Sequence, residues 1–364
     1  MILVTNRVND DDKFIDKRLS QAGLTYQKKL KEFSKPTFEI VFVPSFLNLN
    51  YRNDADKSIF FINSGRAPNL LKFIYYFLDS FRAFFQIVQR KESNIYIYNL
   101  DLQNIFFVFL SCIFLNKKVY LVIADFITYQ NFFLKELFMR CYMLVDGVLI
   151  LNNNINVHDN SVLLPGLIRE REITEPKLNI NKQKNIIFSG SIGMTTGFAL
   201  CVKAFSKVKN INLHISGKPY HMQESEILDL IHSNNINNNI FYHGLLSEEN
   251  YGELLKQCDV ALSLRNPEDE EHNFNFPSKI LEYLSKGKIV ISSKKYEFIS
   301  DEVIDYIEFS EKSLIKCIQK ICKYTDDQFY KRQKIAINYV RNNFTEKTFV
   351  KKIKILESYD KKNT

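Results

Sequence analysis

The sequence predicts an α/β protein of two domains, each a parallel sheet flanked by helices. The chain has 364 residues, more than one hydrophobic core of ordinary size organises. Short runs rich in β-branched and aromatic residues alternate with longer amphipathic stretches, as in parallel sheets with helical crossovers. This alternation stops at a polar stretch, residues 169–184, and then starts again. We therefore expect two domains joined by a linker, with a cleft between them and a helical C-terminal tail.

The first predicted domain covers residues 1–168. Its β-rich runs, expected to be strands, are 2–5, 38–43, 58–62, 95–98, 118–123 and 147–151. Its amphipathic stretches, expected to be helices, are 13–32, 69–91, 102–115 and 128–145. This alternation of β-rich runs and amphipathic stretches favours a parallel sheet flanked by helices.

The second predicted domain covers residues 185–340. Strands are expected at 185–189, 211–216, 240–242, 260–264 and 289–292, and helices at 198–207, 224–234, 247–257 and 277–286. Ser247 is a predicted N-cap, because Glu248 and Glu249 follow it in the first turn. Residues 326–359 are predicted to be helical and basic, and the end of this tail, residues 341–364, is expected to pack back on the first domain.

Composition and charge exclude several classes of protein. Apolar residues make up 46% and charged residues 25%, the balance of a folded globular chain. The net charge of +8 favours phosphate groups or an anionic membrane surface, but no nucleic-acid motif is present. The six Cys residues form no C-x-x-C pair, so neither a disulfide framework nor a zinc site is expected.

Two features of the chain bear on membranes and targeting. The N-terminus turns acidic after a few apolar residues, unlike a signal peptide. The most apolar run, 105–115, is far shorter than the roughly 20 residues of a membrane-spanning helix. We expect a protein of the cytoplasm, soluble or peripheral on the inner face of the membrane.

The most informative segment is RNPEDEEHNFNFPSKILEYLSKGKIVISS, residues 265–293. Pro277 suits the first position of a helix, and Ser278 and Lys279 then occupy a first turn that attracts an anion. Glu282 follows on the same helical face, about 6 Å along the axis from Ser278. A diphosphate at the helix N-terminus would leave its ribose near the Glu282 carboxylate. The alternative interpretation is an ordinary capped helix with a surface glutamate.

Residues 273–293 resemble the nucleotide-sugar segment of retaining GT-B glycosyltransferases, especially bacterial family 4, in which F-P-S-K-x-x-E-Y-x-x-x-G-x-x-V-I-x-S recurs. Other segments follow in the expected order: FSGSI at 188–192, ISGK at 215–218, FYHGL at 241–245, then 248–255 and CDV at 258–260. They resemble the glycine-rich turn of the donor domain, the loop after its second strand and the stretch near the base pocket. The resemblance covers about residues 146–352.

The resemblance implies a GT-B fold, with two Rossmann-like domains that bind the donor in the second and the acceptor in the first. It implies transfer of a hexose from a nucleotide-diphosphate sugar to a carbohydrate or lipid-linked oligosaccharide, in capsule, O-antigen or exopolysaccharide synthesis. Such enzymes stabilise the departing nucleotide diphosphate with fixed charges and helix dipoles. No cofactor and no metal are therefore expected.

The resemblance also assigns residues. Glu282 would bind the ribose, Ser278, Lys279 and the turn at Gly190 and Ser191 would surround the diphosphate, with Lys279 also in a catalytic role. Lys218 and Arg265 are candidate counter-cations. The full donor set is Gly190, Ser191, Gly217, Lys218, Arg265, Asn275, Pro277, Ser278, Lys279 and Glu282.

The chain departs from the family pattern at two places. The family's paired glutamates lie eight residues apart, but the position eight before Glu282 is Phe274. The turn at 191–197 reads SIGMTTG, without the Arg and Lys that the family tends to carry there.

The sugar and the stereochemical outcome stay open, as do two alternatives: a nucleotide-sugar epimerase of this fold, and a non-catalytic nucleotide-binding subunit. A dehydrogenase is disfavoured, since no G-x-G-x-x-G follows the first strand.

Asp125 is the candidate catalytic residue of the acceptor domain. It follows the predicted strand at 118–123, the place where α/β sheets put functional groups. It is placed to orient the acceptor hydroxyl or, in an inverting enzyme, to remove its proton. The alternative is a helix N-cap, a common role of Asp.

The predicted helix at 69–91 has an unusual pattern. Its polar residues Asp79, Arg82, Gln86 and Arg90 form one narrow stripe at helical spacing. The remainder is covered by Phe73, Ile74, Phe77, Leu78, Phe81, Phe84, Phe85 and Val88. Such a helix is either buried against the sheet or embedded at a membrane interface.

Overall fold

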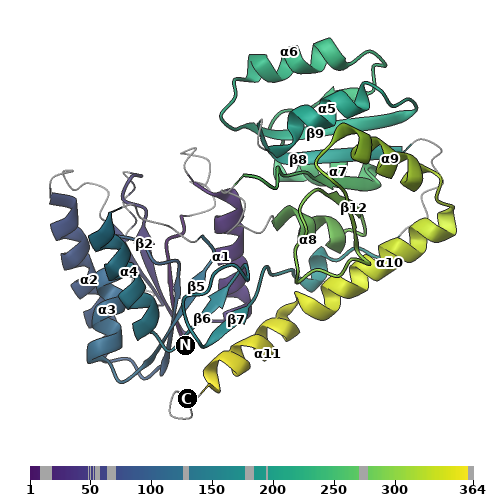
Figure 1. Cartoon of the computed structure of the whole chain (residues 1–364). Coiled ribbons are helices and arrows are strands. Elements are labelled where there is room, and N and C mark those ends of the chain that lie inside the picture. Colours follow the sequence, from purple (N-terminus) through teal and green to yellow (C-terminus); the bar gives the residue numbers. More distant parts are fainter. Residues whose placement is uncertain are drawn as a thin grey trace. The chain divides into compact units, whose positions relative to one another are not determined.

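The computed structural model describes residues 1–8, 19–47, 49, 51, 53, 58–63, 71–125, 131–176, 184–193, 196–269 and 278–359. These residues fold into two compact units (Figure 1). Unit 1 is built from residues 1–167 together with the C-terminal residues from 346 onward, and unit 2 from most of residues 168–345. Among the described helices, none combines the length and hydrophobicity needed to cross a bilayer.

The core of unit 1 is a seven-stranded parallel sheet with the strand order β3-β2-β1-β4-β5-β6-β7. Its strands are β1 Ile2–Thr5, β2 Phe38–Val43, β3 Ile59–Asn63, β4 Asn94–Tyr98, β5 Lys118–Ile123, β6 Gly147–Ile150 and β7 Ser161–Leu163. Every residue of β1, β2 and β6 is buried. Helices must therefore cover both faces of this sheet.

Alternate side chains of each strand point to opposite faces and meet different helices. Ile2 and Val4 share a core with α2 Lys72–Val88, α3 Ile105–Phe114 and α4 Phe132–Leu144. Leu3, between them, faces the other core, which contains residues of α1 Gln21–Ser34 and α11 Glu346–Glu357. The C-terminal helix thus completes the core of unit 1, where it contacts α1, β6 and β7.

Unit 2 is built on a six-stranded parallel sheet with the order β10-β9-β8-β11-β12-β13. Its strands are β8 Lys184–Ile192, β9 Ile211–Pro219, β10 Ile240–Tyr242, β11 Val260–Ser263, β12 Ile289–Ser292 and β13 Ile304–Tyr306. The chain passes from β8 outward to β10 and then returns to the other side of β8 with β11. This reversal of strand order is a topological switch point, where ligands bind in open α/β sheets.

The helices of unit 2 are α5 Phe198–Phe205, α6 Glu224–Asn234, α7 Glu248–Gln257, α8 Ser278–Ser285, α9 Glu311–Cys322 and α10 Asp326–Asn343. The predicted cap of α7 is confirmed, because the Ser247 side chain accepts a hydrogen bond from the Asn250 N–H at 3.2 Å. Helices α5 and α9 share a core with one face of the sheet. Helix α10 packs against α8 and β12.

Several boundaries differ from the sequence prediction. Helix α1 begins only at Gln21, since Ser20 caps it by accepting from the Gly23 N–H. The tail predicted as continuous helix is two helices, because the backbone leaves the helical conformation at Phe344. Strands β7 and β13 and helix α9 were not predicted. The three-residue strands are too short to show a period in the sequence.

The described part of the predicted linker, residues 169–176, belongs to unit 2. Glu170–Glu172 form a short 3₁₀ helix, and Arg341 of α10 contacts Glu170 and Glu175 at 2.8 and 2.9 Å. Residues 169–176 therefore lie on unit 2, and 177–183 fall outside the described residues.

The structure buries Asp79, one of the four residues of the polar stripe predicted from the sequence. This residue is only 1% exposed, on the side that packs against the rest of unit 1 together with Ser80, Ala83 and Ile87. Arg82 reaches its carboxylate at 2.8 Å and remains largely exposed itself. Burial of the acid is tolerated because the opposite charge pairs with it.

The pairing of β8 with β9 yields a test of the fold. Gly217 has a φ of +156°, and a Cβ built there would lie 1.7 Å from the Gly190 carbonyl oxygen. We expect Gly217→Ala to lower the free energy of unfolding by about 1–3 kcal/mol through overpacking, measured by urea denaturation. The matched control is Gly252→Ala in α7, where the new Cβ meets nothing within 4 Å. Equal stability of the two variants would contradict the close approach of the strands.

Candidate functional site

The carboxyl ends of β8 and β9 extend beyond the rest of the sheet. The two strands pair along their whole length, from Lys184 opposite Ile211 to Ile192 opposite Pro219. By contrast, β11 pairs with β8 only as far as Phe188. From Ser189 onward, β8 has a paired strand on one side only, so its other edge faces the switch point.

This extension brings together the predicted residues of both glycine-containing turns. Gly190 lies opposite Gly217, and Ser191 lies opposite Lys218. The two glycines allow the strands to approach closely, because a side chain on Gly217 would collide with the Gly190 backbone. The predicted diphosphate contacts of the two segments therefore form one surface at the carboxyl end of the sheet.

The turn after β8 leads directly into α5. Thr196 Oγ1 accepts from the Gly193 N–H at 2.9 Å and donates to the Gly193 carbonyl at 2.8 Å, which closes the turn. Gly197 precedes α5 with a φ of +74°, and no side chain caps the helix there. A Cβ on Gly197 would lie 2.5 Å from that of Leu264, next to the end of β11. The start of α5 is thus held against the switch point.

Glu282 lies on α8, half-exposed, and contacts two other side chains. Lys279 Nζ forms an ion pair with its Oε2 at 2.9 Å, and the Tyr251 hydroxyl donates to the same oxygen at 3.5 Å. The Lys279 ammonium also lies 3.9 Å from the centre of the Tyr251 ring. Lys279 and Glu282 are therefore brought together with Tyr251 of α7.

A chain of hydrogen bonds links Glu282 to the end of β8. Ser189 Oγ lies 2.7 Å from the Tyr283 hydroxyl and 3.1 Å from the Tyr251 hydroxyl. Burial raises the pKa of both tyrosines far above neutrality, so both stay protonated. Tyr251 has one hydroxyl proton and donates it to Glu282. Ser189 therefore donates to Tyr251, and Tyr283 donates to Ser189. Sequence reasoning missed these three residues, although Ser189 and Tyr283 lie inside the quoted motifs.

Basic residues follow the next two strands. Arg265 comes after β11, and its main chain is tied to Ser293 by hydrogen bonds of 2.7 and 2.6 Å. Burial lowers the pKa of the Arg265 guanidinium, which lies near Tyr296 and Tyr220. Burial, and then the charge of Arg265, lowers the pKa of Lys294. Lys294 was not predicted; its position directly after a strand is the only sequence signal for it.

Of the remaining predicted donor residues, the structure describes only Ser278. Ser278 is the first described residue of α8 and is exposed. Asn275 and Pro277 lie outside the described residues. Among the residues that the structure does describe, no three His, Cys, Asp or Glu side chains gather closely enough to hold a metal ion.

Asp125 lies in unit 1, at the exposed carboxyl end of β5. The Asn99 side chain donates to its carboxylate at 3.2 Å and accepts from the main-chain N–H groups of Ala124 and Asp125. Partial desolvation raises the pKa of the carboxyl group. Helix α4 begins after Asn131, which caps it, so Asp125 does not cap this helix.

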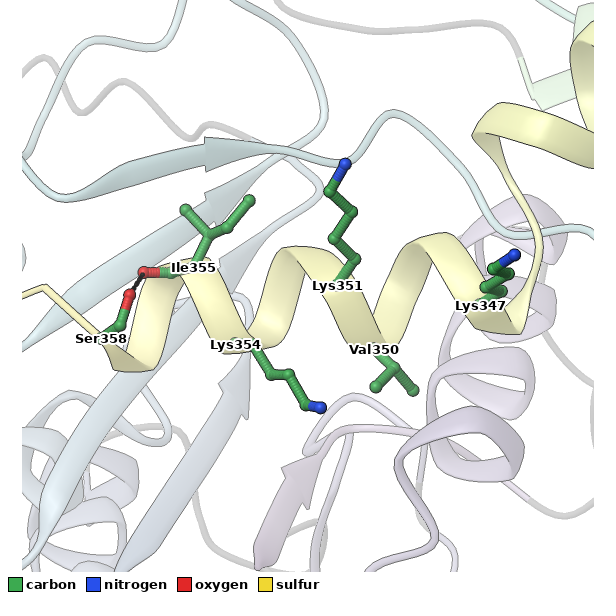
Figure 2. A pocket seen from close by; sticks show the side chains of 6 residues that line it. All are labelled: Lys347, Val350, Lys351, Lys354, Ile355 and Ser358. Carbon is green, nitrogen blue, oxygen red and sulfur yellow. Dashed lines mark hydrogen bonds between the residues drawn. The ribbon is translucent and has the colours of Figure 1, made fainter.

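A hollow on the surface of unit 1 is unrelated to these residues. Figure 2 shows that its lining comes from α11, with Lys351 and Lys354 extending on different sides of the helix. The described lining residues are Lys347, Val350, Lys351, Lys354, Ile355 and Ser358. None of them belongs to the predicted donor or acceptor site.

The comparisons with known proteins agree with this geometry. Residues 170–342 match the family model Glycosyl transferases group 1, and this range contains every residue predicted from the sequence to bind the donor. A search of curated protein sequences gave no match.

Solved structures match over nearly the whole chain. Sucrose-phosphate synthase from Thermosynechococcus elongatus has a TM-score of 0.70 at 13% identity, covering 98% of each chain. Anabaena HepE in complex with UDP and glucose scores 0.69 at 12% identity, covering 98% of this chain and 99% of that one. A glycosyltransferase from Rickettsia africae scores 0.68 at 15% identity, with coverages of 98% and 99%.

The chain has the GT-B fold. At such low identities the structural matches show the fold alone. Together with the family match, the GT-B fold supports a glycosyltransferase that uses a nucleotide sugar. The described residues of the predicted donor set lie in the second unit of this GT-B chain.

An aromatic cluster lies beside this region, on β9 and β10. The His214 ring stacks between Phe241 and His243, with ring centres 5.2 and 5.3 Å apart. His214 Nδ1 and His243 Nε2 are 3.1 Å apart, so one donates to the other when both are neutral. Burial, and then the neighbouring His243, lowers the pKa of His214 to about 4. The stretch 241–245 is the one that resembles the base-pocket region.

The His214 pair predicts a pH dependence of stability. Between His214's ordinary pKa of 6.5 and its folded value of about 4, the unfolded chain binds more protons than the folded chain. The free energy of unfolding therefore falls as pH is lowered through this window. We expect His214→Gln to reduce this slope, measured by urea denaturation from pH 7 to 4. His232→Gln, at an exposed position on α6, is the control. Parallel profiles for wild type and His214→Gln would show that the pair does not titrate in this way.

Proposed function

We propose that this protein is a family-4-like hexosyltransferase. It transfers a hexose from a nucleotide-diphosphate sugar to a carbohydrate or lipid-linked oligosaccharide acceptor, in capsule, O-antigen or exopolysaccharide synthesis. The observation that carries the proposal is the convergence of Lys279, Glu282 and the paired ends of β8 and β9. This convergence lies at the switch point of the unit that matches the family model.

The donor nucleotide is held by groups already fixed in the protein. Glu282 accepts from the ribose hydroxyls, and the hydrogen-bond chain through Tyr251 and Ser189 fixes its position relative to the glycine-containing turns. The diphosphate lies along Gly190, Ser191 and Lys218. HepE has the same fold, and its structure is of a complex with UDP and glucose. This similarity supports a nucleotide-sugar donor for this chain.

Catalysis rests on positive charge placed where negative charge develops. When the bond between the sugar and the diphosphate breaks, the departing phosphate gains charge. Lys279, Arg265 and Lys294 supply cations, and the first turn of α8 supplies free N–H groups. The Tyr251 ring beneath Lys279 and the burial of Arg265 restrict the motion of both cations. We propose that these groups act without a metal or other cofactor.

On the acceptor side, Asp125 is the proposed orienting group or base. Its raised pKa makes it a stronger base than an ordinary carboxylate, and Asn99 fixes its direction. We also propose that the protein works in the cytoplasm, in peripheral contact with the inner face of a membrane that carries a lipid-linked acceptor.

The proposal predicts that Glu282 binds the nucleotide. We expect Glu282→Ala to weaken binding of the cognate nucleoside diphosphate by about 1–3 kcal/mol, the cost of removing a charged hydrogen-bond partner. Thermal-shift screening identifies that nucleotide, and calorimetric titration then measures the loss. Glu253→Ala on α7 is the control, since this exposed glutamate forms an ion pair with Lys256 of the same helix. Equal affinities of Glu282→Ala and wild type would remove Glu282 from the site.

The proposal also predicts the course of turnover. With its cognate nucleotide sugar, the protein should release free nucleoside diphosphate only when an acceptor is present, at a rate unchanged by excess EDTA. Coupled-enzyme detection of the diphosphate measures this. Conversion of the donor to an epimer without acceptor would show an epimerase, and binding without turnover a non-catalytic subunit. Activity lost in EDTA and restored by Mg²⁺ or Mn²⁺ would refute the metal-free mechanism.

A further inference from the structure

Helix α2 presents its most apolar side outward. The residues that it buries include Asp79 and Ser80, which are 1% and 0% exposed. On the outward side, Phe85 is 66% exposed, with Phe73 and Ile74 also exposed. This is the reverse of an ordinary surface helix, in which the apolar side packs against the core.

Exposed aromatic side chains continue across α3 and α4, although these two helices also bury apolar residues. These helices lie beside α2 on one face of the unit 1 sheet (Figure 1), and α3 contacts both of the others. Phe114 is 67% exposed and Phe132 is 80% exposed. We call the exposed apolar side chains of α2, α3 and α4 the aromatic face; it includes Phe73, Ile74, Phe85, Phe114, Phe132 and Phe133.

The arrangement of the aromatic face is held by contacts within it. The Phe106 ring of α3 meets the rings of Phe73 and Phe77 of α2 edge-on, with centres 5.2 and 5.3 Å apart. The exposed rings thus belong to packed helices with defined positions. An apolar surface of this breadth on a monomer marks an interaction site.

The charges of these helices favour an anionic partner. Helix α3 contains no charged residue. The acidic residues of the other two helices, Asp79 and Glu136, are each paired with an arginine of the same helix. The charges that remain, Lys72 and Lys135, are both positive. The three helices that form the aromatic face therefore carry a small net positive charge.

The chemistry of the exposed side chains distinguishes a bilayer from a protein partner. A protein interface carries about one hydrogen bond per 100–200 Å². Most of the exposed side chains on α2, α3 and α4 are hydrocarbons or aromatic rings, which offer few such groups. An apolar surface on helices that also carry cations suits the boundary between headgroups and acyl chains.

We propose that the aromatic face is the surface by which this protein docks on a bilayer with anionic headgroups. The phenylalanine rings enter the headgroup–acyl boundary, and Lys72 and Lys135 lie among the headgroups. This inference rests on the proposed function for one point only: the reason for docking, which is to give unit 1 access to a lipid-linked acceptor. Membrane docking is measured without turnover. The docking proposal and the proposed glycosyl transfer can therefore fail independently.

The lysines of α11 serve as a control for vesicle binding through overall positive charge. Helix α11 is richer in lysine, with Lys347, Lys351 and Lys354 around its surface hollow. It packs on the opposite face of the unit 1 sheet from α2, α3 and α4. A flat bilayer that contacts the aromatic face does not reach α11, whereas binding through overall charge would involve both.

The experiment is co-sedimentation of the full chain with vesicles of phosphatidylcholine, alone or with phosphatidylglycerol, at low and high salt. The test variant is Phe85→Gln/Phe114→Gln/Phe133→Gln, one exposed ring from each helix. The control variant is Lys347→Gln/Lys351→Gln/Lys354→Gln. Circular dichroism and thermal unfolding of each variant verify the fold, which substitution at exposed positions leaves intact.

We expect the wild type to bind anionic vesicles more tightly than neutral ones and to retain part of its binding at high salt. The phenylalanine variant should lose roughly tenfold or more of its partition coefficient, and the lysine variant should retain it. Failure of the wild type to bind either vesicle, or equal loss in both variants, would overturn the proposal. So would a dimer in analytical ultracentrifugation that dissociates in the phenylalanine variant, since a second copy would then cover the face.

Discussion

The candidate site depends on the place where β8 loses one of its two neighbouring strands. Beyond Phe188 the strand pairs with β9 alone, and its next residue, Ser189, has a hydroxyl that two tyrosines share. Through Tyr251 and Tyr283 this single hydroxyl ties α7 and α8 to the sheet. The position of Glu282 relative to Gly190 and Gly217 follows from these bonds. A partly buried network in which each group has a partner restricts the motion of its side chains, and a preorganised site requires little reorganisation when a ligand binds.

Electrostatics at the same place follow from the fold of unit 2. Arg265 and Lys294 come directly after adjacent strands, and parallel strands end at one edge of the sheet, so these cations lie together. Their pKa values are lowered mainly because the fold removes water from them, while the nearby Asp269 acts in the opposite direction on both. The same desolvation makes each charge act more strongly on a bound phosphate.

In unit 1 the main feature is how the helices cover the sheet and which side chains they expose. Its sheet is covered on both faces, and one of the covering helices, α11, comes from the far end of the chain. On the other face, α2 buries mostly small and polar side chains, α3 and α4 bury larger apolar ones, and all three helices also expose aromatic side chains. The core is thus complete without the aromatic face. An outward surface of this kind is available to a partner that excludes water, and in a bilayer that partner is the hydrocarbon itself.

The sequence by itself determined the fold class, most of the strands and the donor motif, because these depend on local periodicity and on residues close together in the chain. Ser278, Lys279 and Glu282 are neighbours on one helical turn, so their spacing alone predicted one surface. Only the tertiary structure brought together Ser189, Tyr251 and Tyr283, which lie up to 94 residues apart. Only the tertiary structure showed that Lys294 lies near Arg265. It also decided the orientation of α2: a helical pattern gives the relative directions of side chains, but packing against the sheet decided that Asp79 faces in and Phe85 faces out.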